Sequence, residues 1–120
     1  MTKHQIIIVG GGAAGIATAS SLLSRDASLD IAIIEPSDQH FYQPGWTMVG
    51  AGIFTKGQTV RSTDSAWPSG IKRIKGAVAT FSPDKNNIIL EDGSEVLYEY
   101  LVVAAGLKLD WGAIEGLENT

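Results

Sequence analysis

The chain has 120 residues, of which 44% are hydrophobic, so that it can form one modest core, and no apolar run approaches the roughly 20 residues needed to span a bilayer. Its 13 acidic and 9 basic residues give a formal net charge of −4, which provides no electrostatic footprint for nucleic acid. The absence of cysteine excludes disulfides and thiolate metal sites, and we expect no metal at the two isolated histidines, His4 and His40.

The chain opens with a predicted strand, glycine turn and helix. The apolar run at residues 6–9 predicts a buried parallel strand. Gly10, Gly12 and Gly15 follow with GxGxxG spacing, which serves a tight turn, close approach to a pyrophosphate and close helix packing, respectively. Small or apolar residues then recur at helical spacing: Ala13, Ala14, Ile16, Ala17, Ala19 and Leu23. We expect the first amides of this helix, around Gly12, Ala13 and Ala14, to face the phosphates.

Glu35 ends a second apolar strand at residues 31–34 and lies 20 residues after Gly15. A carboxylate at this point can accept hydrogen bonds from both ribose hydroxyls of an adenosine, and it argues against a 2′-phosphate. A glycine-rich turn alone would be weak evidence. Two strands, a turn, a helix and an acid in register predict a βαβ unit that binds a dinucleotide.

Residues 36–70 form a long excursion that is rich in Pro, Gly, Ser and Thr, and we expect one short helical turn within it. Excursions of this length are usually functional or disordered. The aromatic content argues against disorder; these residues are Phe41, Tyr42, Trp46, Phe54 and Trp67.

The pattern then becomes that of β structure. Strands are predicted at residues 71–81, 88–90 and 96–98, separated by a turn and by the hairpin signal Asp92–Gly93. They would form a three-stranded antiparallel meander. The apolar run 100–106 would rejoin the parallel sheet as a buried strand.

Side chains outside these motifs are expected at the surface. Lys72, Arg73 and Lys75 form the only basic cluster, which is typical of a solvated strand face. Arg61 and Asp64 are also expected at the surface. The sequence offers no catalytic residue.

The predicted layers leave part of the sheet without cover. A parallel sheet needs cover on both faces, yet this chain supplies one clear helix, so that the opposite face and at least one sheet edge would be exposed. We therefore expect residues 1–120 to self-associate through that edge or face.

These motifs together resemble the first half of the FAD-binding domain in two-dinucleotide-binding flavoproteins related to glutathione reductase. The run Leu101-Val-Val-Ala-Ala-Gly106 is similar to the second signature of that superfamily, with Ala105 in place of a threonine. The resemblance adds Ala105 and Gly106 to the cofactor-binding residues. A meander at this position implies FAD, since single NAD-binding domains do not usually carry one.

The fold class expected from the resemblance is α/β: a Rossmann-like βαβ parallel sheet with an inserted three-stranded antiparallel β-meander. Residues 1–120 would be the amino-terminal part of an FAD/NAD(P)-binding Rossmann-like domain, and the FAD-binding domain would be incomplete.

The excursion itself resembles one branch of this superfamily. The stretch from His40 to Gly52, after Glu35-Pro-Ser, is similar to the corresponding stretch of sulfide:quinone oxidoreductases, in the branch shared by mitochondria and many bacteria. The resemblance implies that Gln43, Pro44 and Gly45 lie near the flavin ring or its approach. For the neighbouring aromatic residues, core packing is at least as good an explanation as substrate contact.

In that family, a cysteine pair captures sulfide, and two electrons pass through FAD to a membrane quinone. Because the chain has no cysteine, we expect a catalytically inactive amino-terminal fragment that recognises at most the ADP half of FAD. The parent would take sulfide and quinone and lie peripherally on the inner or cytoplasmic membrane, through carboxy-terminal sequence that is missing here. The fragment itself is expected to be soluble.

Other interpretations remain open from the sequence. A type II NADH dehydrogenase or a flavocytochrome sulfide dehydrogenase would share the βαβ start and the meander. A noncatalytic nucleotide-binding module of this length is a second alternative, and a fold that binds nothing is a third.

Overall fold

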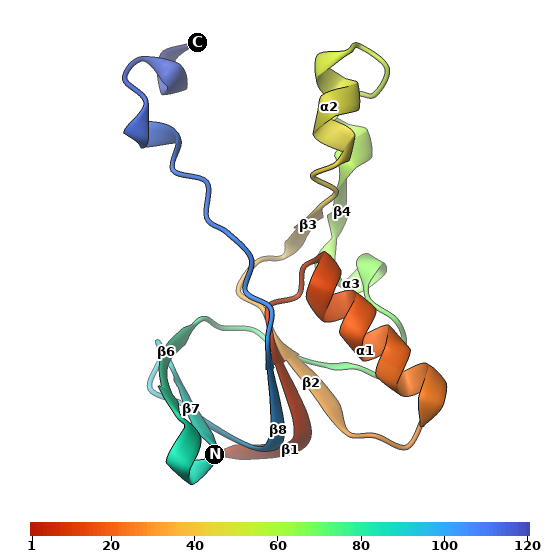
Figure 1. The fold of residues 1–120 in the computed structure, drawn as a ribbon, viewed down its shortest axis with the longest axis vertical. Helices are drawn as coiled ribbons and strands as arrows, with labels where there is room; N and C mark the ends of the chain where they lie inside the picture. Colours follow the sequence, from red (N-terminus) through yellow and green to blue (C-terminus); the bar gives the residue numbers. More distant parts are fainter.

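The computed structural model describes residues 1–120, and Figure 1 shows their arrangement. The helices and strands in chain order are β1 (Thr2–Val9), α1 (Ala13–Arg25), β2 (Ile31–Ile34), β3 (Gln39–Phe41), α2 (Gly45–Gly50), β4 (Val60–Ser62), α3 (Thr63–Ala66), β5 (Lys72–Ile74), β6 (Val78–Ser82), β7 (Asn87–Leu90) and β8 (Glu95–Val103). Short 3-10 turns lie at Lys56–Thr59, Pro83–Lys85, Trp111–Ala113 and Leu117–Asn119. No helix combines the length and the apolar character that a membrane crossing requires.

The main sheet has six strands in the order β5-β2-β1-β8-β7-β6. β1 pairs in parallel with both β2 and β8, and β2 pairs in parallel with β5. β6, β7 and β8 pair antiparallel, as a meander. The predicted fold class is therefore confirmed: a βαβ start, a parallel sheet and an antiparallel meander.

Several predicted strand boundaries are wrong. β1 begins at Thr2 and not at residue 6, because residues 2–4 pair with β8. The stretch 71–81 divides into β5 and β6, because the chain leaves the parallel sheet near Gly76 and passes against Leu90, whose Cδ1 would lie 3.1 Å from a Cβ at that glycine. The predicted strands 96–98 and 100–106 are one strand, β8, which ends at Val103. It pairs with β7 near its start and with β1 along most of its length. The excursion is also more ordered than one helical turn, since β3 and β4 pair and α2 and α3 flank them.

Both faces of the sheet carry a core. On one face α1 packs against the first two strands in a buried cluster of Ile6, Ile8, Ala19, Ile31 and Ile33. On the other face the meander curls over the sheet, as Figure 1 shows. Its residues join the strands in a second buried cluster of Ile7, Val9, Ala32, Ile34, Ile88, Leu90, Val96 and Tyr98. The expectation that the face opposite the helix is exposed is therefore wrong, because the meander supplies the missing layer.

The end of β8 is less well covered on either face. On the helix side, Tyr100 pairs with Ile6 of β1, yet its side chain is 64% exposed. On the meander side, Val103 pairs with Val9 and is 60% exposed. The strand predicted here as fully buried is therefore only partly so. β5 and β6 form the two edges of the sheet.

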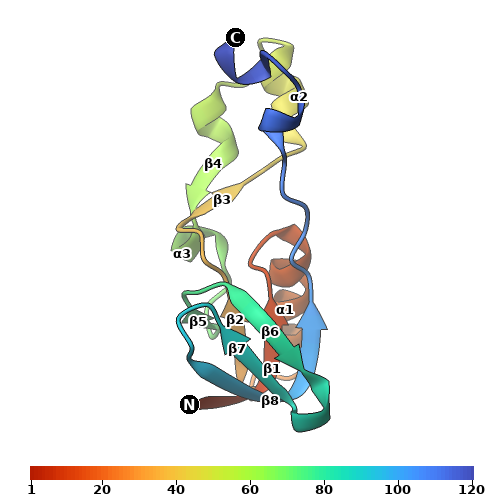
Figure 2. The same ribbon diagram turned by 90° about the vertical axis from the view of Figure 1, so that its left-hand side faces the viewer.

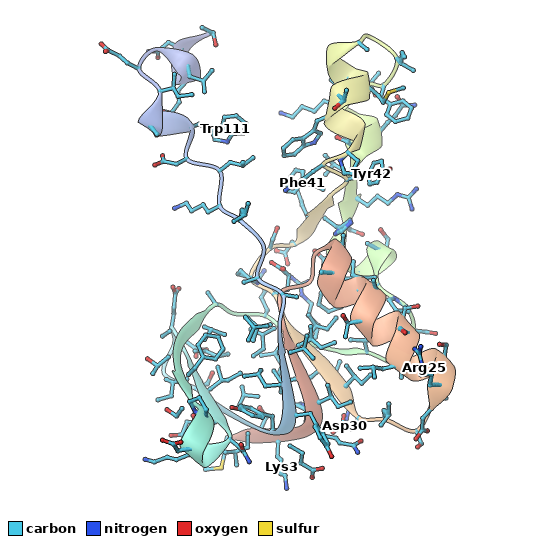
Figure 3. All side chains as sticks on the ribbon, viewed as in Figure 1. Lys3, Arg25, Asp30, Phe41, Tyr42 and Trp111 are labelled. Atoms are coloured by element: carbon cyan, nitrogen blue, oxygen red, sulfur yellow. The ribbon has the colours of Figure 1, made fainter.

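Two segments extend beyond the carboxyl ends of the parallel strands. One is the β3–α2–β4 arm, and the other is the segment 104–120 after β8; both views show them at the same end of the molecule (Figures 1 and 2). Figure 3 shows Phe41 and Tyr42 on the arm and Trp111 on the carboxy-terminal segment. A cleft at the base of these segments is lined by most of the residues predicted to bind the cofactor.

Candidate nucleotide-binding site

The glycine turn between β1 and α1 is shaped by close backbone contacts. Gly10 has φ +103°, and a Cβ there would overlap the carbonyl oxygen of Ala104. A Cβ on Gly15 would overlap the carbonyl oxygen of Gly10, so that this glycine lets α1 pack directly on the turn. Packing therefore requires both residues to be glycine.

Gly12 differs from these two glycines. Its φ is −79°, which any residue can adopt, and an added Cβ would meet nothing within 4 Å. Gly12 also borders an open cleft. Nothing in the protein fills the space beside it, and this leaves room for the close approach of a ligand to the main chain.

The amino terminus of α1 opens onto the same cleft. Gly12 is the N-cap, and no side chain caps the helix there. The first amides of a helix have no intrahelical acceptor, and they carry the positive end of the helix dipole. Ala13 and Ala14, which bring two of these amides, line the cleft and have no side chain long enough to obstruct it. This end of the helix is suited to bind an anionic group.

Glu35 lies across the cleft, immediately after β2, where its carboxylate is held by two backbone amides. Gly11 N–H donates to Oε2 at 2.8 Å, and Ser37 N–H donates to Oε1 at 2.8 Å. No lysine, arginine or histidine forms an ion pair with this carboxylate. An ionised carboxylate has about four acceptor positions, so that lone pairs remain for hydroxyl donors.

Eight of the ten residues predicted to bind the cofactor line this one cleft, whose volume is about 530 Å³; they are Gly12, Ala13, Ala14, Glu35, Gln43, Pro44, Ala105 and Gly106. Gly10 borders a neighbouring hollow, and Gly15 is buried beneath the turn. The structure therefore brings together residues from the turn, β2, the β3–α2 arm and the segment after β8. Gly45, also expected near the flavin, is buried at the start of α2 and does not line the cleft.

The neighbouring hollow has a volume of about 320 Å³ and shares Glu35 and Ala105 with the cleft. Its lining is mostly apolar and comes from the meander and the strand ends: Val9, Ile34, Pro36, Gly76, Ala77, Val78, Phe81 and Val103. An apolar slot of this kind beside the Glu35 carboxylate could take a flat apolar ring such as a purine.

Sequence reasoning missed several residues of these walls. In the cleft they are His40, Ala104 and Leu107; in the slot, the residues from Gly76 to Val78. Phe41 and Tyr42, for which both core packing and substrate contact were considered, also line the cleft. The short run Gly76-Ala77 was the available signal, since small residues permit close approach of the chain. Gly11 was also missed, because the GxGxxG pattern leaves its position open.

A third hollow of about 600 Å³ lies between α1 and the β3–β4 arm and includes Arg61. Arg61 and Asp64 are exposed, as expected. This hollow shares Ala13, His40 and Tyr42 with the cleft but contains neither Glu35 nor Gly12. It therefore lacks two of the residues that define the candidate site: the one expected to bind ribose and the one expected to lie against the pyrophosphate.

The basic cluster of Lys72, Arg73 and Lys75, on β5 and directly after it, is only partly a solvated face. Lys72 and Lys75 have side chains that are 64% and 62% exposed, whereas that of Arg73 is only 20% exposed. Arg73 is partly buried, and its guanidinium donates to the carbonyl oxygen of Ser37 and to Asp38, at 2.7 and 2.8 Å. Hydrogen bonds from Lys75 and Arg73 lower the pKa of the Asp38 carboxyl.

Comparison with known proteins gives one family over nearly the whole chain. The family model for pyridine nucleotide-disulphide oxidoreductase matches residues 4–120. The mitochondrial sulfide:quinone oxidoreductase of Mus musculus is 45% identical over 114 residues, which cover 95% of this chain and 25% of that protein. The one from Dictyostelium discoideum is 43% identical over 116 residues, which cover 96% of this chain and 26% of that protein.

A solved structure agrees with these relatives. The X-ray structure of the sulfide:quinone oxidoreductase from Aquifex aeolicus matches with a TM-score of 0.76 and 26% identity, over 98% of this chain and 27% of that chain. The resemblance stated from the sequence is confirmed. The chain spans about a quarter of the length of the curated relatives that it matches.

Proposed function

The chain belongs to the pyridine nucleotide-disulphide oxidoreductase family, and we propose that it is the part of a sulfide:quinone oxidoreductase that holds the ADP half of FAD. The observation that carries this proposal is the meeting of Gly12, the α1 amino terminus and Glu35 at one cleft. The similarity to named sulfide:quinone oxidoreductases supports the choice of parent enzyme.

The residues present fit an adenosine diphosphate group. Glu35 would accept hydrogen bonds from the ribose hydroxyls, and the amides around Ala13 and Ala14 would bind the pyrophosphate. The apolar slot between Pro36 and Val78 would take the adenine ring. Glu35 lines both the slot and the cleft, so that it lies between the proposed adenine and pyrophosphate subsites, as ribose does in ADP.

The remainder of the cleft extends toward the β3–α2–β4 arm and the carboxy-terminal segment. Gln43 and Pro44 on one side and Ala105 and Gly106 on the other would border the part of the cofactor beyond the pyrophosphate, while most contacts to that part would come from other sequence. FAD, when bound, supplies two-electron redox chemistry. The residues of this chain bind and orient it, and we assign none of them a catalytic role.

Sulfide and quinone would be substrates of the whole enzyme. A sulfur-capturing cysteine pair would have to come from outside these 120 residues, which contain no cysteine. Docking of the whole enzyme on the inner or cytoplasmic membrane would likewise use sequence outside them. Self-association of this chain would use the sheet edges and the exposed end of β8.

Replacement of Glu35 by alanine tests the proposal. We expect Glu35→Ala to weaken ADP binding by about 1–3 kcal/mol, because the ribose hydroxyls lose a charged acceptor. The measurement is isothermal titration calorimetry. Glu115→Ala is the matched control, since Glu115 is exposed on the carboxy-terminal segment and lines none of the hollows described. Equal ADP affinity in the wild type and Glu35→Ala would remove Glu35 from the site.

A further inference from the structure

Trp67, the residue after α3, packs against the outer side of the glycine turn. Its indole Nε1–H donates to the carbonyl oxygen of Gly11 at 3.3 Å. A Cβ on Gly11 would overlap Cζ2 of the indole and lie 3.0 Å from Cβ of Glu35. Gly11 is therefore wedged between Trp67 and Glu35, and no larger residue would fit there.

The same contacts continue into a closed ring of side chains and backbone. Gly11 N–H donates to Glu35 Oε2, and Ser37 N–H donates to Glu35 Oε1. The carbonyl oxygen of Ser37 accepts from Arg73 Nη2 at 2.7 Å. The guanidinium carbon of Arg73 lies 5.9 Å from the centre of the Trp67 ring, at cation–π distance, and this contact closes the ring.

Trp67 does not line the cleft, the apolar slot or the hollow beside Arg61. Its hydrogen bond reaches the cleft through Gly11, whose carbonyl oxygen accepts from Trp67 and whose N–H donates to Glu35. A Glu side chain that is free to rotate loses conformational freedom when it binds a ligand, and a side chain already held in place loses less.

The charge of Arg73 does not draw Glu35 away from the cleft. Arg73 forms an ion pair with Asp38 at 2.8 Å, and the Asp38 carboxylate forms a second ion pair with Lys75 at 2.6 Å. Glu35 forms no ion pair of its own, so that its remaining lone pairs stay available to hydroxyl donors.

We propose that Trp67, which also contacts Arg73, is a positioning residue that orients the Glu35 carboxylate toward the ribose hydroxyls through the backbone of Gly11. This inference rests on the proposed binding of an adenosine dinucleotide. It makes a tryptophan outside the cleft a determinant of how strongly the site distinguishes a ribose with hydroxyls from one without them.

The test compares two nucleotides in two variants. Trp67→Phe keeps an aromatic ring against Gly11 and removes the indole N–H. We expect it to weaken ADP binding about three- to tenfold, the scale of one lost hydrogen bond, and to leave the affinity for 2′,3′-dideoxy-ADP unchanged. Trp111→Phe is the control, because Trp111 is 52% exposed on the carboxy-terminal segment; it should leave both affinities unchanged. Equal weakening of both nucleotides in Trp67→Phe, or of neither, would overturn the proposal.

A second measurement needs no nucleotide. In the ligand-free chain, Gly11 N–H donates to Glu35 Oε2, and we expect this amide to be protected from hydrogen exchange. The protection should fall in Trp67→Phe and be kept in Trp111→Phe. If the wild type binds neither nucleotide, the proposed function fails, and the exchange rate of the Gly11 amide still decides the role of Trp67. Equal exchange rates in Trp67→Phe and the wild type would contradict that role.

Discussion

Gly12 and Gly15 belong to the same turn but are glycine for different physical reasons. A Cβ on Gly15 would overlap the carbonyl oxygen of Gly10, whereas one on Gly12 would meet no protein atom within 4 Å. Gly15 is explained by the fold, and Gly12 by the ligand that the cleft is proposed to hold. Their substitutions should therefore have separable effects.

We expect Gly15→Ala to lower the free energy of unfolding by about 1–3 kcal/mol, the usual cost of overpacking. Gly12→Ala should leave stability within about 1 kcal/mol and weaken ADP binding at least about tenfold, or 1.4 kcal/mol. Urea denaturation and calorimetry measure the two effects. Gly50→Ala, at an open position in α2, is the control for both. Unchanged ADP affinity in Gly12→Ala would show that no ligand approaches the turn there.

At the scale of elements, the local patterns predict β1, α1 and β2 well. Their apolar and small residues repeat at the spacing of a buried strand and an amphipathic helix. The start of β1 is the exception, since residues 2–4 pair with β8 and were not predicted as strand. The glycine turn and Glu35 follow from the same stretch, which is why this half of the site could be predicted from the sequence.

The boundaries of β5, β6 and β8 could not be predicted in the same way. The break after Ile74 depends on the approach of Gly76 to Leu90, which lies on a different strand. The continuity of β8 depends on its pairing with two partners, β7 and β1. The hydrogen bonds of Arg73 likewise depend on Ser37 and Asp38, more than thirty residues earlier in the chain. The slot beside Glu35 was missed because its walls form only when the meander folds over the sheet.

The contact between β5 and the loop after β2 should be sensitive to acid. Hydrogen bonds from Lys75 and Arg73 lower the folded-state pKa of Asp38 from its ordinary value of 3.8, so that its stabilising contribution is present above about pH 4 and is lost as pH falls through the lowered pKa. We expect Asp38→Asn to reduce the loss of stability between pH 5 and about pH 2, as measured by urea denaturation. Asp110→Asn, at an exposed acid without an ion pair, should keep the wild-type pH dependence. An identical pH profile for Asp38→Asn and the wild type would contradict this role.

At the scale of the whole molecule, the meander gives the sheet a second covered face, but the end of β8 keeps exposed apolar side chains. Tyr100 is 64% exposed on the helix side of this strand. Exposed apolar side chains on a sheet favour association. We expect residues 1–120 to self-associate with rising concentration and Tyr100→Thr, which keeps β propensity, to weaken the association. Light scattering across a concentration series measures both; a wild-type monomer at every concentration would count against this expectation.

The central claim is that these residues form the binding site for the ADP half of a dinucleotide and leave the flavin half to other sequence. Calorimetric titration of the wild-type chain with ADP, FAD and NADH tests it most directly. The account predicts that ADP and FAD bind with similar, weak affinity and that NADH binds no more tightly, because all three share the group that Glu35 and the α1 amino terminus contact. FAD binding more than about tenfold tighter than ADP, a difference of 1.4 kcal/mol, would contradict the division of the site, and the absence of any binding would contradict the site itself.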